Sequence, residues 1–149
     1  MSDVLINPAR VRRVKPLSAE EVVSAVERAL LTEVRLTPKP GLVDIRNAGA
    51  HRDMDLASFE ASTAVVAPWM EKFFIMGHDT AAVAPEQVLM MLRPVGMACE
   101  NDMLEATGGV NTHRGAIFAF GLLSAAAGRL VSKGEPIDCL LYTSDAADE

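Results

Sequence analysis

Polar residues interrupt the apolar pattern of this sequence in three places, and the first is a loop built around one lysine. Lys39 stands between Pro38 and Pro40, and Gly41 follows. The two prolines fix the backbone, so the loop can present a cation with little further loss of conformational entropy. This arrangement suits a phosphate group, and the alternative is an ordinary turn with a solvated lysine.

The second place is the segment 44–55, which combines three carboxylates, one histidine and two arginines. Aspartate and histidine can bind a metal, and aspartate can act as a general base. The spacing matches no zinc motif, so a hard ion such as Mg²⁺, shared with substrate phosphates, is the more natural metal. We expect Asp55 to cap the next helix, which leaves His51 and Asp53 as site candidates.

The third place begins at Arg93, on a stretch with helical character. Helical spacing puts Arg93, Gly96 and Glu100 on one stripe, which continues through Met103 and Thr107. The arginine and the glutamate would then share a surface, and the glycine would let a ligand approach the backbone. The alternative is an ion pair on a solvated helix face.

A glycine-rich turn, residues 108–115, follows and leads into another helix. Helix N-termini have unpaired N–H groups that favour anions, whereas cations there oppose the helix dipole. A bound phosphate would explain His113 and Arg114 at this position. Asn111 and Thr112, one of which should cap the helix, are grouped with the same anion site. The turn is neither a P-loop nor a dinucleotide-binding fingerprint.

Helices must position these segments, and the capping and breaking residues place them. A capping box at Ser18 and Glu21 opens the first helix. Pro68 is expected to kink or split the second helix, which should end at Gly77, and Pro94 to interrupt the third. The expected helices span residues 18–35, 56–77, 85–107 and 113–133, with a long loop at 36–54.

The composition agrees with an all-α, multi-helix bundle. Half of the 149 residues are hydrophobic but only 5% are aromatic, which favours packed helices over a sheet. The formal charge of −6 argues against nucleic acid as a partner. The apolar stretch 116–131 is short for a bilayer and is interpreted as a buried helix. Two cysteines and no visible secretory signal favour the cytoplasm.

The polar segments together resemble the triphosphoribosyl-dephospho-CoA synthase family over about residues 25–133. The resemblance is carried by LTEVRLTPKPGLVDIRNAGAHRDMDLASF and by LRPVGMACENDMLEATGGVNTHRGAIFAFGLL. Members of this family join ATP to 3′-dephospho-CoA and release adenine. The product is the precursor of the prosthetic group of the acyl carrier subunit of citrate lyase or malonate decarboxylase, which a separate transferase attaches. The resemblance also implies an all-helical, Mg²⁺-dependent enzyme.

The resemblance assigns roles to the candidate residues, although it leaves open which carboxylate does which task. Six residues are assigned to the phosphates of the substrates: Lys39, Arg93, Asn111, Thr112, His113 and Arg114. Three are assigned to acid–base chemistry: Glu100, Asp53 and His51. Two are assigned to the metal: Glu33 and Asp102.

Residues 1–17 show no clean period and are predicted to be a flexible leader, with an anion-binding arm as the alternative. The resemblance implies that residues 18–138 are the N-terminal part of one helical catalytic domain. Residues 139–149 depart from the family pattern and are predicted to be a non-native tail. In such a truncated bundle the last helix would expose apolar surface. A metal-dependent nucleotide phosphohydrolase and a non-catalytic helical interaction module are the rival functions.

Overall fold

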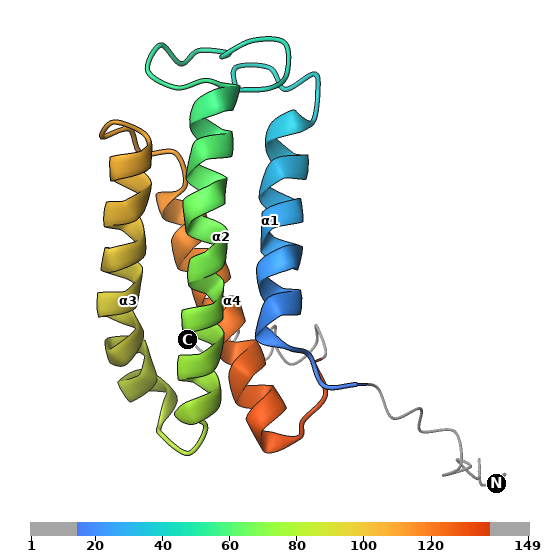
Figure 1. Ribbon diagram of the computed structural model, residues 1–149, viewed down its shortest axis with the longest axis vertical. Coiled ribbons are helices and arrows are strands. Elements are labelled where there is room, and N and C mark those ends of the chain that lie inside the picture. The colour runs from blue at the N-terminus through green and yellow to red at the C-terminus, as the bar shows by residue number, and fades with distance from the viewer. Residues whose placement is uncertain (1–14, 138–149) are drawn as a thin grey trace, which may run out of the picture.

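The computed structural model describes residues 15–137 as a bundle of four helices that alternate in direction (Figure 1). No strand occurs within this range, so the predicted all-α class is confirmed. The predicted tail and the first fourteen residues of the predicted leader lie outside the described residues. The helices are α1 (Ala19–Arg35), α2 (Leu56–Asp79), α3 (Pro85–Ala106) and α4 (Arg114–Lys133).

The predicted starts of α1 and α2 are confirmed by their capping contacts. The Ser18 hydroxyl accepts the N–H of Glu21 at 3.2 Å, and the Glu21 carboxylate accepts the N–H of Ser18 at 2.8 Å. Asp55 caps α2 in the same way, with its carboxylate 2.9 Å from the backbone nitrogen of Ser58. Each cap satisfies N–H groups that have no partner within the helix. The end of the long loop is therefore fixed at Asp55.

The two internal prolines do not break their helices. Pro68 lies inside a continuous α2 and Pro94 inside a continuous α3, so the interruption predicted at Pro94 is wrong. A proline removes one backbone hydrogen bond, but α2 packs against the other three helices. Tertiary packing of this kind commonly overrides local propensity.

The predicted end of α2 at Gly77 is also wrong, because α2 continues to Asp79 and this glycine serves helix packing. A Cβ atom at Gly77 would lie 1.9 Å from the carbonyl oxygen of Ala125. A Cβ atom at Gly128 would lie 2.0 Å from the carbonyl oxygen of Phe74. The backbones of α2 and α4 therefore touch directly, as the small residues of α4 predict.

The core lies between α2 and its three neighbours and is made of aliphatic, methionine and phenylalanine side chains. Met70 and Met103 are the largest fully buried side chains. Cys99 is buried beside them, and desolvation raises the pKa of its thiol to about 12. A thiol that stays protonated at neutral pH is a poor nucleophile, so Cys99 belongs to the packing.

α4 is buried on one side only, which corrects its interpretation as a buried helix. Within the described residues, it is the one helix long and apolar enough to cross a membrane, and the core helices of soluble proteins share that composition. Its inner side packs along α2. On its outer side Phe118 is 66% exposed and Leu123 45% exposed. The predicted exposed apolar surface is thus confirmed.

The contact between α2 and α4 predicts a large effect of one methyl group. Gly77→Ala places a Cβ atom against backbone, which cannot rotate away, so the free energy of unfolding should fall by about 1–3 kcal/mol. Gly115→Ala, on α4 with no atom within 4 Å of its added Cβ, should leave it unchanged or raise it by up to about 1 kcal/mol. Urea unfolding followed by circular dichroism measures both, and equal effects would contradict the close approach.

Candidate active site

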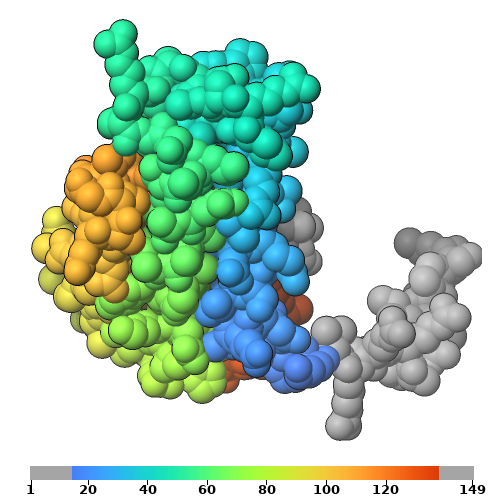
Figure 2. Space-filling view, turned by 45° about the horizontal axis from the view of Figure 1, so that its top comes forward, coloured from blue at the N-terminus to red at the C-terminus, as the bar shows by residue number. Residues whose placement is uncertain are grey.

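The loop 36–54 and the turn 108–113 lie at one end of the bundle because the helices alternate in direction, whereas Arg93 lies near the middle of α3. The loop 36–54 joins the upper ends of α1 and α2, and the turn from α3 to α4 reaches the same end (Figure 1). Figure 2 shows the loop spread over the tops of α1 and α2, with the end of α3 beside it. Segments far apart in the sequence therefore share one end of the molecule.

The loop is folded around one buried carboxylate, Asp44. Its oxygens accept backbone N–H groups from Lys39 at 3.1 Å, Arg46 at 2.7 Å and Asn47 at 3.1 Å. A hydrogen bond from the Thr37 side chain, together with these N–H groups, lowers the pKa of Asp44 to about 2. Asp44 was one of several equivalent carboxylates in the sequence, and the structure shows that it organises the loop.

The loop closes on itself at Gly49, which has a φ of 60°. A Cβ atom there would lie 2.5 Å from the carbonyl carbon of Gly41, so no other residue fits without a backbone shift. Ala50 donates its N–H to the oxygen of Gly41 at 3.1 Å. His51 and Asp53 follow directly, with His51 half-buried and Asp53 exposed. Their acid–base roles stay predictions.

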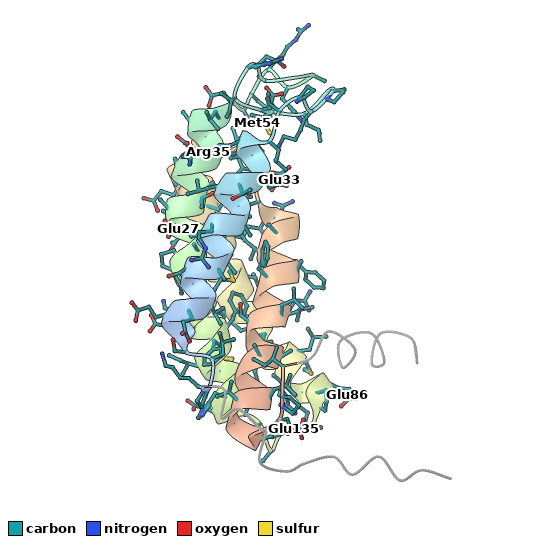
Figure 3. The ribbon with its side chains drawn as sticks, turned by 90° about the vertical axis from the view of Figure 1, so that its right-hand side faces the viewer. Glu27, Glu33, Arg35, Met54, Glu86 and Glu135 are labelled. Carbon is teal, nitrogen blue, oxygen red and sulfur yellow. The ribbon has the colours of Figure 1, made fainter. Side chains whose placement is uncertain are left out.

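Lys39 is paired with Glu33, although the sequence assigned one to phosphate and the other to metal. The Lys39 ammonium donates to the Glu33 carboxylate at 2.9 Å and to the Glu33 carbonyl oxygen at 2.7 Å. Only 14% of the Lys39 side chain is exposed, against 59% for Glu33. Figure 3 shows Glu33 and Arg35 at the upper end of α1, next to the loop that carries Met54.

A second cation–carboxylate pair joins the start of α4 to α3. The Arg114 guanidinium contacts one Glu100 oxygen through Nε at 2.7 Å and through Nη2 at 2.5 Å. This pair lies beside a groove of about 470 Å³ between α3 and α4, and Arg93 and Gly96 line the same groove. The predicted stripe is confirmed over these positions, but Met103 turns fully into the core.

The two predicted metal ligands have different partners. Asp102 accepts the indole N–H of Trp69 at 2.8 Å, on the side where α3 meets α2, whereas Glu33 pairs with Lys39. Across residues 15–137 no three histidine, cysteine or acidic side chains gather in a way that could hold a metal ion. The side chains present therefore do not fit a preformed Mg²⁺ site, and the assignment of these two residues as one metal site is not supported.

His113 is a buried imidazole rather than an exposed cation. It is 6% exposed and its ring packs edge-on against Phe59, with the ring centroids 5.0 Å apart. Its Nδ1 lies 2.6 Å from the Ser62 hydroxyl, which also accepts the Thr112 hydroxyl at 2.7 Å. Desolvation lowers the pKa of His113, while the Glu33 charge acts in the opposite direction. At neutral pH the ring is therefore uncharged.

Ser62 was missed because nothing near it in the sequence marks it. It is a small polar residue within the apolar α2, and its partner His113 is 51 positions away. Asn111 also makes an internal contact, since its side-chain oxygen accepts the N–H of Arg114 at 3.1 Å. The expectation that Asn111 or Thr112 is the N-cap of α4 is wrong, because the N-cap is His113, although the Asn111 side chain still satisfies one N–H at the start of the helix. Phosphate binding by Asn111, Thr112 and His113 stays a prediction.

Comparison with known proteins identifies the family. Residues 19–148 match the family model described as ATP:dephospho-CoA triphosphoribosyl transferase. The chain belongs to this family. The match includes every polar segment described above. No solved structure matches the chain.

Similar curated proteins carry the corresponding name. A 2-(5''-triphosphoribosyl)-3'-dephosphocoenzyme-A synthase of Klebsiella pneumoniae is 99% identical over 138 residues, which are 93% of this chain and 46% of that protein. A probable synthase of Salmonella gallinarum is 69% identical over 138 residues, which are again 93% of this chain and 46% of that protein. One of Albidiferax ferrireducens is 54% identical over 79% of this chain and 39% of its own length. The chain thus spans about half the length of these relatives.

The hydrogen bonds to Asp44 predict a specific loss of order in the loop. Asp44→Asn keeps the shape but removes the charge that three N–H groups share, so exchange of those amides should accelerate about tenfold or more. Asp53→Asn, at an exposed position of the same loop, should leave them unchanged. Amide hydrogen exchange by NMR measures both. Because the pKa of Asp44 is lowered from 3.8 to about 2, the protection should persist above pH 3.8 and be lost as the pH falls toward 2.

The buried state of His113 predicts a pH-dependent stability. The pKa of His113 in the folded chain lies below 6.5, the ordinary value for histidine. As the pH falls, the unfolded chain therefore takes up the proton at a higher pH than the folded chain does. Stability is full above pH 6.5 and should fall below it, by up to about 1.4 kcal/mol per pH unit. His113→Gln should flatten this dependence, and His78→Gln, at an exposed position, should not.

The hydrogen bond between Ser62 and His113 predicts a single tautomer of the His113 ring. Since Thr112 donates to Ser62, the Ser62 proton is available to Nδ1, which leaves the ring proton on Nε2. Nitrogen-15 NMR shifts should report this tautomer in the unsubstituted chain. Ser62→Ala should redistribute the ring proton between Nδ1 and Nε2. An unchanged spectrum would argue against the hydrogen bond between Ser62 and His113.

Proposed function

We propose that this chain forms the substrate-binding end of an enzyme that joins ATP to 3′-dephospho-CoA and releases adenine. The observation that carries the proposal is the match of residues 19–148 to the transferase family. The structure supports it by gathering two cation–carboxylate pairs and a neutral histidine at one end of the bundle. The product, 2′-(5″-triphosphoribosyl)-3′-dephospho-CoA, would pass to a separate cytoplasmic transferase that loads the acyl carrier subunit of citrate lyase or malonate decarboxylase.

The reaction is a substitution at the anomeric carbon of the ATP ribose. A ribose hydroxyl of dephospho-CoA forms the new C–O bond, the C–N bond to adenine breaks, and the departing base takes up a proton. By analogy with glycoside cleavage, the transition state resembles an oxocarbenium ion. A carboxylate is suited to accept the hydroxyl proton and to stabilise the cation. Glu100 is our candidate because it borders the groove between α3 and α4.

The two ion pairs suggest how the phosphates of the substrates are received. Lys39 is held by Glu33 and Arg114 by Glu100, so neither cation is an open anion site. A triphosphate carries more charge than one carboxylate and can compete for both cations. Its binding would release Glu100 from Arg114, which would make this carboxylate available as a base only when substrate is present.

We also propose that ATP enters as its Mg²⁺ complex. Mg²⁺ commonly keeps several water ligands and is held by substrate phosphates with one or two carboxylates. The dispersed acidic residues described above agree with an ion that arrives with the nucleotide. No step of the proposed reaction requires a metal site preformed by this chain.

The reaction can be tested with the full-length Klebsiella pneumoniae relative. Incubation with Mg·ATP and dephospho-CoA should release one adenine per triphosphoribosyl product, as measured by liquid chromatography and mass spectrometry. Glu100→Gln at the equivalent position should lower kcat by about 100-fold or more if this carboxylate is the base. The control is Glu86→Gln, on the same helix but at the opposite end of the bundle (Figure 3), which should keep full turnover.

Two outcomes would point to the rival functions instead. Release of phosphate or pyrophosphate without adenine would indicate a nucleotide phosphohydrolase. Absence of ATP binding, together with indifference to Lys39→Ala, would indicate a non-catalytic interaction module. Wild-type turnover of the Glu100→Gln variant would leave the reaction in place but remove Glu100 from it.

A further inference from the structure

Large apolar side chains line one exposed face of the bundle, formed by α3 and α4. We call this the α3–α4 face and define it by Leu89, Met90, Met97 and Phe118, which are 51%, 75%, 61% and 66% exposed. All four line the groove of about 470 Å³ described above. Contiguous apolar surface of this kind on a folded protein marks a place where something else packs.

The composition of α4 supports the same conclusion. The core helix of a soluble protein with this hydropathy is mostly buried, yet only 39% of the most apolar stretch of α4 is buried. α4 packs mainly against α2 and contacts α3 and α1 far less. It forms one edge of the bundle (Figure 3), so its outer side has no neighbour among the described helices.

The surface is better suited to a polypeptide than to a small ligand. Ligand pockets are concave and enclose most of the molecule they bind, whereas the side chains of this face are more than half exposed. The face also combines apolar side chains with a few charged ones, as protein interfaces do. Arg93 and the Glu100–Arg114 pair are the charged groups.

The lengths of the relatives indicate which polypeptide packs on the α3–α4 face. The region matched here makes up 46% of the Klebsiella pneumoniae protein, so more than half of that protein lies outside it. We propose that, in full-length members of the family, this remaining part packs on the α3–α4 face and covers the groove. The proposal rests on family membership and not on the proposed reaction, so it stands even if the reaction is different.

One substitution in two contexts tests the proposal. In the present chain Phe118 is exposed, so Phe118→Glu should change the melting temperature by no more than the error of the measurement. In the full-length relative the same substitution would bury a charge, and the melting temperature should fall by several degrees. Ile75→Glu is the matched control, on α2 with 45% exposure and outside the groove, and should be neutral in both.

A second measurement does not depend on tolerance of a buried charge. A cysteine replacing Phe118 should react with a maleimide at least tenfold more slowly in the full-length relative than in the present chain. A cysteine replacing Ile75 should react at similar rates in both. Equal rates at position 118, with an unchanged melting temperature for Phe118→Glu, would overturn the proposal.

Other occupants of the face give distinct results. If a second copy covers it, sedimentation will show a dimer of the present chain that Phe118→Glu dissociates, and the full-length relative will be unaffected. If a substrate covers it, Phe118→Glu will weaken dephospho-CoA binding by the full-length relative without lowering its melting temperature. Either result would replace the remaining part of the polypeptide as the occupant.

Discussion

The direct contact between the backbones of α2 and α4 is the constraint on which the rest of the structure depends. Glycines at 77 and 128 let the two parallel helices approach until carbonyl oxygens occupy the space of a side chain. The register set there continues to the other end of the helices, where His113 meets Ser62. With the start of α4 held in this way, Arg114 can reach across to Glu100 on α3.

Local signals predicted most of the fold, and their failures have a common physical cause. The capping residues Ser18 and Asp55 act within three residues of themselves, so the sequence was sufficient to place them. Pro94 and Gly77 were misjudged because their local preferences are outweighed by packing against helices distant in the sequence. The boundaries that depend on one turn of chain were therefore predictable, and those that depend on neighbours were not.

The same division applies to the candidate site. Residue types and spacing placed Arg93 and Glu100 on one surface, because helical periodicity is a local property. The pairing of Lys39 with Glu33, and the burial of His113, follow from segments that meet only in the folded chain. A cation considered alone in the sequence suggests an anion site, whereas in the folded chain Lys39 is paired with a nearby carboxylate.

The proposed chemistry and the α3–α4 face are physically linked. Glu100 and Arg114 line the groove and are partly exposed, so water weakens their interaction with each other and with any bound charge. A polypeptide packed on the α3–α4 face would exclude that water and strengthen the interaction with a developing oxocarbenium ion. The fold of this chain fixes the positions of the charged groups, while the strength with which they act depends on what covers them. In the proposed enzyme, positioning and desolvation would thus be supplied by different parts of the polypeptide.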